Sequence, residues 1–276
     1  MATDEAEAPP VLRRLEDGVA WITLDRPEAG NAITAAMRDQ IIVWLEEASA
    51  DLAVRVVVLT GAGEKGFCTG ADLRSSGPGP VRPAGAPDRA VGDAARLIRT
   101  GWQRLISAVL DCEKPVIAAV NATAAGGGMH LALACDLVLA AEEAKFIEVF
   151  VRRGTAPDAG GAYLLPRLIG PQRAKELFFF GDDVPAAEAE RLGLVNRVVP
   201  RLELLTLAGE WAARLASGPT RAISVAKHLT NHSFESDRAT AFREEAMAQE
   251  LVTGTEDCAE GLAAFAGRRP PVFRGW

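Results

Sequence analysis

The stretch from Lys114 to Asp136, KPVIAAVNATAAGGGMHLALACD, constrains the fold of this chain more than any other segment. It begins with a continuous apolar run, Pro115 to Val120, which is typical of a strand buried on both faces of a sheet. Small residues, Asn121 to Ala125, and the glycines Gly126–Gly128 then lead into a helical pattern over Met129 to Cys135. The sequence therefore predicts a buried strand that turns through glycines into a helix.

Two explanations of this glycine run stay open. The start of a helix exposes backbone N–H groups at the positive end of the helix dipole, and glycines let a reacting oxygen approach them closely. Alternatively, the glycines only allow helix and strand to pack tightly. A second glycine-rich turn, Gly61 to Leu73, follows another predicted strand, Val54 to Thr60. Together, Thr69–Asp72 and Gly126–Gly128 could direct two N–H groups at one carbonyl oxygen, as an oxyanion hole does.

Strand and helix patterns alternate over residues 1–200, and only helical patterns follow. Further strands are expected over Val19–Leu24, Leu137–Ala141, Lys145–Ile147 and Val195–Val199. One helix is expected from the N-cap Thr34 to about Ala48, and another from after Asp158 to about Pro166. The other helices of this part are expected over Ala94–Val109, Gln172–Phe180 and Ala186–Leu192. Helical patterns then cover 202–216, 219–231, 236–251 and 256–266. We expect an α/β core over residues 1–200 and a helical region over 201–276 whose amphipathic faces need a partner surface. Residues 1–10 are expected to fray, and Ser75 to Asp88, rich in Pro and Gly, to form a loop that could act as a lid.

Composition excludes several classes of function. The net charge of −7, from 30 basic and 37 acidic residues, argues against nucleic acid as the main partner. The four cysteines lack metal-ligand spacing and indicate reduced thiols, so we expect a cytoplasmic protein. There is no basic leader and no long apolar segment, so neither secretion nor a membrane span is expected. The three scattered histidines, and the absence of G-x-S-x-G and Walker motifs, leave the two glycine turns as the candidate site.

The order of motifs resembles the crotonase superfamily, that is, the enoyl-CoA hydratases and isomerases. GFCTGADL and AAGGGMHLALACD are similar to its two signature segments. LDRPEAGNA, PDAGGAYLLPRLIG, AERLGLVNRVVP and RRPPVFRG are similar to further family segments and follow in the usual order. The resemblance covers nearly the whole chain and rests on the set of motifs, since each motif alone is weak.

This resemblance implies an α/β fold, namely a spiral of ββα units with a C-terminal helical trimerisation region, assembled as a homotrimer or a dimer of trimers. It implies an acyl-CoA thioester as substrate, with coenzyme A as part of that substrate and no metal or redox cofactor. The carbonyl oxygen would accept hydrogen bonds from the backbone N–H groups of Ala71 and Gly127. The CoA portion would contact Glu28, Ala29, Gly30, Asp72 and Leu73, together with Phe273 and Arg274, in some members from a neighbouring subunit.

The chain departs from the hydratases at two positions. Hydratases carry one glutamate two residues after the glycine triplet and another before the P-x-A-G-G segment, where this chain has His130 and Phe150. Phenylalanine cannot transfer a proton. Histidine can, although a histidine on a buried helix is also commonly a packed, hydrogen-bonded residue. We expect His130 and Phe150 to contact the substrate, and Glu148 is the less favoured substitute for the missing carboxylate.

Asp158 matches the aspartate of relatives that lack the hydratase pair, such as dienoyl-CoA isomerases and the ring-epoxyphenylacetyl-CoA isomerase. In the chlorobenzoyl-CoA dehalogenases the same position supplies a nucleophile, but their tryptophan partner is absent at Phe150. Asp158 could instead only cap the helix that begins near Ala159. We expect an enzyme that shifts the double bond of an enoyl-CoA, with Asp158 moving the proton. A hydratase with unusual acid/base residues and a non-catalytic acyl-CoA-binding protein are the alternatives.

Overall fold

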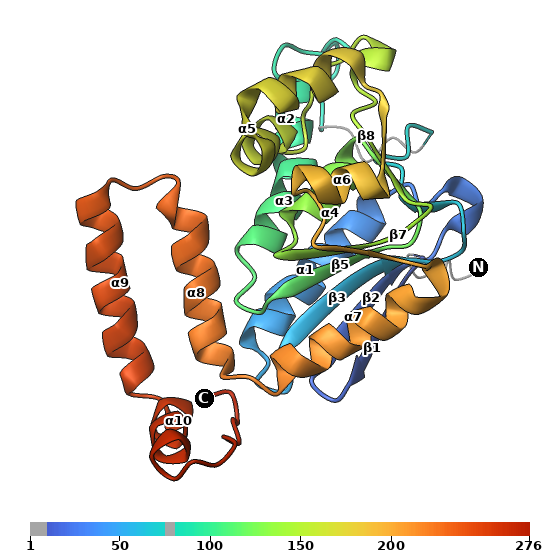
Figure 1. Cartoon of the computed structure of the whole chain (residues 1–276). Coiled ribbons are helices and arrows are strands. Elements are labelled where there is room, and N and C mark those ends of the chain that lie inside the picture. The colour runs from blue at the N-terminus through green and yellow to red at the C-terminus, as the bar shows by residue number, and fades with distance from the viewer. Residues whose placement is uncertain (1–9, 75–80) are drawn as a thin grey trace, which may run out of the picture.

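The computed structural model describes residues 10–74 and 81–276, which form two sheets surrounded by helices (Figure 1). The main sheet has the order β1 (Val11–Glu16), β2 (Val19–Leu24), β3 (Val56–Gly61), β5 (Val116–Val120), β7 (Leu137–Ala141) and β10 (Arg197–Val199). Only β1 and β2 pair antiparallel in it. The smaller sheet has the order β4 (Gly66–Cys68), β6 (Thr123–Ala125), β8 (Lys145–Ile147) and β9 (Asp183–Pro185). The expected α/β class is confirmed.

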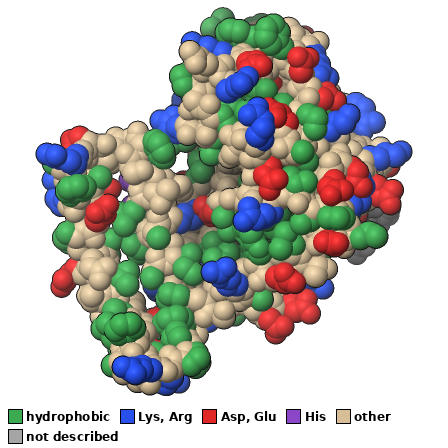
Figure 2. Space-filling view, viewed as in Figure 1, with side chains coloured by type: hydrophobic (Ala, Val, Ile, Leu, Met, Phe, Trp, Pro, Cys, Tyr) green, Lys and Arg blue, Asp and Glu red, His purple; other side chains and the backbone are tan. Residues whose placement is uncertain are grey.

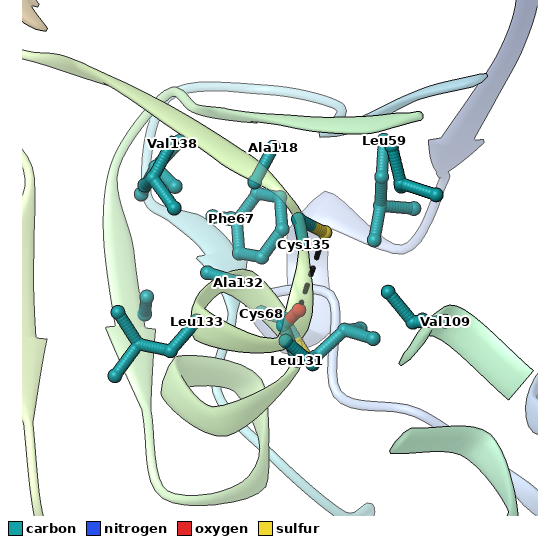
Figure 3. Close-up of a cluster of buried hydrophobic side chains, with 14 of the residues drawn as sticks. Leu59, Phe67, Cys68, Val109, Ala118, Leu131, Ala132, Leu133, Cys135 and Val138 are labelled. Carbon is teal, nitrogen blue, oxygen red and sulfur yellow. Dashed lines mark hydrogen bonds between the residues drawn. The ribbon is translucent and has the colours of Figure 1, made fainter. Parts of the chain in front are cut away.

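Alternate residues of the central strands belong to two different hydrophobic clusters. Val57 and Leu59 of β3 face the cluster formed with α1 (Ala35–Ala50), α3 (Trp102–Leu110) and α4 (Gly127–Ala134). Val56 and Val58 face α7 (Arg201–Ala216) instead. Because both faces of the sheet are covered, its central strands are continuous apolar runs. Figure 3 shows part of the first cluster, in which the Phe67 ring of β4 packs among Ala118, Ala132 and Val138.

Several predicted elements agree with the structure, and others do not. Thr34 caps α1 as expected, since its Oγ1 accepts a hydrogen bond from the Met37 N–H at 3.3 Å. The single helix expected over Ala94–Val109 is wrong, because Gly101 divides it into α2 (Asp93–Thr100) and α3. The helix expected to stop near Pro166 ends a little later. In α5 (Gly161–Phe180) the first part passes Pro166 and is interrupted at Gly170, where φ is 77° and ψ is 160°, and the helix expected over Gln172–Phe180 is its second part.

The sequence patterns did not indicate β1, β4 or β9, and β6 lies in what was expected to be a turn. The short helices η1 (Pro27–Ala29), η2 (Val151–Arg153) and α6 (Ala186–Leu192) complete the core. The expected frayed tail lies, apart from its last residue, outside the described residues. Of the expected lid loop, 75–80 also lie outside them, and 81–88 are irregular.

The last three helices extend away from the core and are called the C-terminal arm here: α8 (Thr220–Ser233), α9 (Arg238–Thr253) and α10 (Glu256–Ala266) (Figure 1). The expected boundary at residue 201 falls before α7, which packs on the main sheet through Leu204, Ala208 and Ala212. The arm alone therefore stands apart from the sheets. Hydrophobic side chains gather on its surface (Figure 2).

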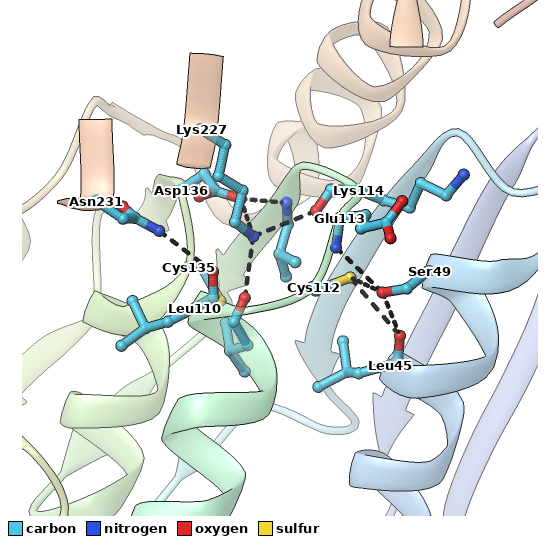
Figure 4. A network of polar contacts seen from close by, with 12 residues as sticks. Leu45, Ser49, Leu110, Cys112, Glu113, Lys114, Cys135, Asp136, Lys227 and Asn231 are labelled. Atoms are coloured by element: carbon cyan, nitrogen blue, oxygen red, sulfur yellow. Dashed lines mark hydrogen bonds and ion pairs between the residues drawn. The ribbon is translucent and has the colours of Figure 1, made fainter. Parts of the chain in front are cut away.

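A partly buried ion pair attaches the arm to the core (Figure 4). The Lys227 Nζ of α8 lies 2.9 Å from the Asp136 carboxylate, and it donates to the backbone oxygens of Val109 at 2.9 Å and Lys114 at 3.3 Å. Asn231 adds a hydrogen bond to the Leu110 oxygen at 3.2 Å. The backbone oxygens of Val109 and Leu110 lie at the C-terminal end of α3. The positive charge of Lys227 therefore also complements the negative end of the α3 dipole.

Candidate active site

The two glycine-rich turns meet in the structure. A Cβ atom built on Gly70 would lie 3.5 Å from the backbone nitrogen of Gly127, and Gly70 has a φ of 96° that favours glycine. The Gly70 oxygen accepts a hydrogen bond from Ile33 at 2.8 Å, which holds the first turn in place. Within the described chain, neither the Ala71 N–H nor the Gly127 N–H has a protein acceptor. Two free donors on adjacent turns are what an oxyanion hole requires.

The glycine run also permits very close packing, so the two explanations of it are compatible. A Cβ on Gly128 would lie 2.0 Å from the Cys68 backbone oxygen, which means that the start of α4 touches β4 directly. At Gly127 the neighbour is the Trp102 ring, 2.9 Å from a built Cβ. Nothing in the sequence singled out Trp102, since it lay inside an expected continuous helix. Its ring forms a wall beside the Gly127 donor.

Asp158 lies in the segment between η2 and α5 and is half-buried. It does not cap α5 through its side chain, because the N-cap residue is Gly160 and no side chain caps this end. Its backbone oxygen accepts a hydrogen bond from Gln103 Nε2 of α3 at 3.3 Å. Burial raises the pKa of the Asp158 carboxyl above its ordinary value, and the charge of His130 opposes this rise. A carboxylate with a raised pKa is a stronger base.

His130 is fully buried and hydrogen bonded. Its Nε2 lies 2.8 Å from Glu148 Oε1, and the Phe150 ring stacks on the imidazole with centroids 5.4 Å apart. A Cβ on Gly126 would lie 3.6 Å from the Phe150 ring, so Phe150 lies close to the second glycine turn as well as to His130. Phe150 is partly exposed, whereas His130 and Glu148 are not. Phe150 thus covers one face of the imidazole.

The segment Glu28–Gly30 lies beside the first glycine turn. The Thr69 N–H donates to the Gly30 oxygen at 3.1 Å, and a Cβ on Gly30 would lie 3.0 Å from Thr69 Cγ2. Leu73 is 73% exposed, as a residue available to a ligand would be. The Asp72 carboxylate is occupied within the protein, because it accepts the Arg74 N–H at 3.0 Å and pairs with Arg26 at 2.9 Å. These two donors, with the Arg74 N–H first, lower the pKa of Asp72.

Phe273 and Arg274 belong to the C-terminal region of this chain. The Phe273 backbone oxygen accepts a hydrogen bond from Arg55 at 3.2 Å, and its ring lies against Gly261. The Arg274 N–H donates to Asp257 at 2.6 Å. The positions of both residues are thus fixed by the arm and by Arg55 of the core, at a place other than the two glycine turns.

A cleft of about 860 Å³ separates α3, α4 and α5 from α8, and is visible between core and arm in Figure 2. Gln103 and Gly160 line one side of it and Lys227 the other, but Ala71, Gly127 and Asp158 do not line it. Over the described residues, no group of three or more His, Cys, Asp or Glu side chains could hold a metal ion. No helix in that part of the chain is long and apolar enough to cross a membrane.

Comparisons with known proteins agree with each other. The family described as enoyl-CoA hydratase/isomerase matches residues 14–275. A protein of Rhodobacter capsulatus named "Probable enoyl-CoA hydratase" is 38% identical over 95% of this chain and 96% of its own length. The 1,2-epoxyphenylacetyl-CoA isomerase of Escherichia coli is 36% identical over 96% and 98%. The crystal structure of an enoyl-CoA hydratase from Bacillus anthracis has a TM-score of 0.86 at 37% identity, covering 97% of this chain and 100% of that one.

Proposed function

Because this chain belongs to the enoyl-CoA hydratase/isomerase family, we propose that it moves the double bond of an enoyl-CoA thioester along the acyl chain. The family, and the acyl-CoA chemistry common to it, are as the motifs led us to expect. The choice of isomerisation rests on one observation: a half-buried carboxylate, Asp158, lies close enough to His130 for the charge of His130 to act on it. His130 and Phe150 occupy the positions where hydratases carry glutamates.

In this mechanism the thioester oxygen accepts hydrogen bonds from the N–H groups of Ala71 and Gly127. The Asp158 carboxylate removes a proton from C2 of a 3-enoyl thioester, and the electron pair moves onto the oxygen to give a dienolate. The N-terminus of α4 stabilises this negative charge. The Asp158 carboxyl then returns the proton to C4, and the double bond shifts from C3–C4 to C2–C3. One carboxylate therefore suffices for the whole reaction.

Hydration is the second candidate, favoured by the names of two relatives given above. It would need the buried His130–Glu148 pair to activate water in place of the usual two glutamates. With Phe150 covering the imidazole, water has poor access to this pair. Hydration of crotonyl-CoA should accordingly be slow, since loss of a general acid or base costs about 10²–10⁴-fold.

Asp158→Asn tests the proposed base. The amide keeps the shape of the side chain but cannot accept the proton, so isomerisation of 3-hexenoyl-CoA, followed by the absorbance of the conjugated product, should fall by roughly 10²-fold or more. Melting temperature and affinity for a CoA ligand should stay unchanged. Asp237→Asn is the matched control, because Asp237 is a true helix cap that accepts the Thr240 N–H at 2.8 Å.

Three results would contradict the proposal. A folded Asp158→Asn variant with wild-type turnover would show that Asp158 is not the base. Hydration of crotonyl-CoA as fast as isomerisation would favour the hydratase. Binding of enoyl-CoA ligands by the wild-type protein without turnover of any would favour a non-catalytic acyl-CoA-binding protein.

We also propose that the C-terminal arm joins copies of this chain into a trimer or a dimer of trimers. The support is the apolar surface of α8–α10, where Phe265 is 85% and Leu251 71% exposed. In such an assembly Phe273 and Arg274, which lie beside the arm, could contact CoA in the same or a neighbouring subunit.

A further inference from the structure

Two buried polar side chains beside the candidate base use only half of their hydrogen-bonding capacity. The side chains of His130 and Glu148 are 0% and 1% exposed and are joined at 2.8 Å. Their other polar atoms, His130 Nδ1 and Glu148 Oε2, have no hydrogen-bond partner among the described residues. Burying polar atoms without partners costs stability, and native proteins keep few of them. Stabilisation of the fold alone therefore does not explain why this buried pair is present.

The His130 imidazole lies directly against the segment that carries Asp158. A Cβ built on Gly161 would lie only 2.0 Å from His130 Nε2, so the backbone at the start of α5 touches the ring. Gly161 follows Asp158 by three residues. On the α3 side, the Gln103 amide donates to the Asp158 backbone oxygen at 3.3 Å. The Asp158 segment is thus fixed by α3 and by the imidazole of α4.

We propose that His130, held in place by Glu148, is a positioning residue for Asp158, both by supporting the start of α5 and by presenting its charge to the Asp158 carboxylate. This inference rests on the proposed function, in which Asp158 moves the proton. His130 is fully buried, and this role does not require the contact with the substrate that the sequence led us to expect.

The charges around Asp158 make this role measurable. Burial raises the pKa of Asp158, and the His130 charge lowers it. Of the other groups on neighbouring elements, Gln103 is neutral, Glu148 faces His130, and Arg152 of η2 is paired with Asp183 at 2.8 Å. The remaining cation of η2, Arg153, is exposed to solvent. Without His130, burial is opposed only by the hydrogen bond from the Asp158 backbone, so the pKa of Asp158 rises and a higher pH is needed to form the base.

The first experiment is the pH profile of kcat/KM for 3-hexenoyl-CoA in the wild type and in His130→Gln. The acidic limb should move up by about one pH unit in the variant, which is about a tenfold loss at low pH, and the rate should recover at high pH. Glu148→Gln should move the limb in the same direction by less. His228→Gln, at an exposed histidine of α8, should leave the profile unchanged.

A merely structural role would lower the rate of His130→Gln equally at every pH, and this result, or an unmoved limb, would overturn the inference. If His130→Gln does not fold, His130→Asn replaces it, and if neither folds, Glu148→Gln alone decides by the same criterion.

A second measurement separates this inference from the proposed function. The ¹³C resonance of the Asp158 carboxyl, assigned by its loss in Asp158→Asn, should titrate at a higher pH in His130→Gln than in the wild type. If the midpoint moves but Asp158→Asn retains full turnover, the proposed reaction is wrong and the positioning role stands. If Asp158→Asn is inactive and the midpoint does not move, the positioning role alone is wrong.

Discussion

The region of the glycine turns and the C-terminal arm differ in how much of their apolar surface is buried. All eight residues of α4 are buried, whereas α9 has no buried residue. The arm exposes large apolar side chains to 61% or more: Phe234, Phe242, Met247, Leu251, Leu262 and Phe265. The candidate chemistry therefore lies where the chain packs completely on itself, and the arm presents a surface suited to another copy. Substitutions in the two regions should have opposite consequences, for folding in one and for association in the other.

Gly128→Ala should produce the largest effect, in the closely packed region. Its Cβ would overlap the Cys68 backbone oxygen, 2.0 Å away, and neither backbone can move without separating α4 from β4. We expect a loss of about 4 kcal/mol or more in the free energy of unfolding, measured in urea. The control is Gly209→Ala in α7, where the nearest atom is 4.0 Å away. Alanine there should stabilise the helix by roughly 0.5–1 kcal/mol. Equal effects at both sites would refute the close contact.

Lys227→Met tests the link between the two regions. It leaves the Asp136 carboxylate, 21% exposed, without its cation, and should lower the free energy of unfolding by about 3 kcal/mol at neutral pH. Burial raises the pKa of Asp136 and Lys227 opposes this, so the variant raises that pKa further. A raised carboxyl pKa destabilises the fold above the unfolded pKa, about 3.9, and not below it.

The loss in Lys227→Met should accordingly shrink as the pH falls toward 4, where Asp136 becomes protonated and no longer needs a cation. The double variant Lys227→Met/Asp136→Asn, which has no buried charge at this place, should show a loss that does not change with pH. A loss in Lys227→Met that is the same at pH 4 and pH 7 would mean that the charge of Asp136 does not contribute.

The smallest effect on stability is expected in the arm. Phe242→Ser combined with Phe265→Ser removes side chains that are 63% and 85% exposed, so the unfolding free energy of the single chain should change by less than about 0.5 kcal/mol. If the proposed trimer or hexamer forms, light scattering should nevertheless show smaller particles for this variant than for the wild type. Val91→Ser, at a fully exposed valine outside the arm, should leave the particle size unchanged. A wild-type protein that is already monomeric would rule out the proposed assembly.

Sequence patterns predicted the long central strands because burial on both faces makes them uninterrupted apolar runs, as in Val116–Val120. They did not predict β4 or β9, since β4 lies within a glycine-rich turn and β9 (Asp183–Pro185) contains a proline and only one apolar residue with a strand preference, Val184. The break at Gly101 and the passage of α5 through Pro166 depend on tertiary packing, which overrides local preference.

At the site, the sequence pattern indicated two glycine-rich turns that could meet, and the resemblance to the family assigned the two donors to Ala71 and Gly127. The His130–Glu148 pair joins residues 18 apart, and the contact of Trp102 with Gly127 joins α3 to α4. Both depend on how a helix is rotated against its neighbours, which a single sequence does not reveal. For the same reason, the sequence did not show that Phe150 lies near the second glycine turn rather than the first.

The strand order β1-β2-β3-β5-β7-β10 follows the order of synthesis. Each new strand can therefore join the edge left by the one before it, while later parts of the chain are still on the ribosome. Parallel pairs joined by long crossovers form slowly, and transiently exposed apolar surface favours aggregation. Here α7 and then the arm are synthesised last. The exposed apolar surface of the arm therefore appears only after all strands of the main sheet have been synthesised. We therefore expect this order of elements along the chain to shorten the time during which incomplete chains could aggregate through apolar surface.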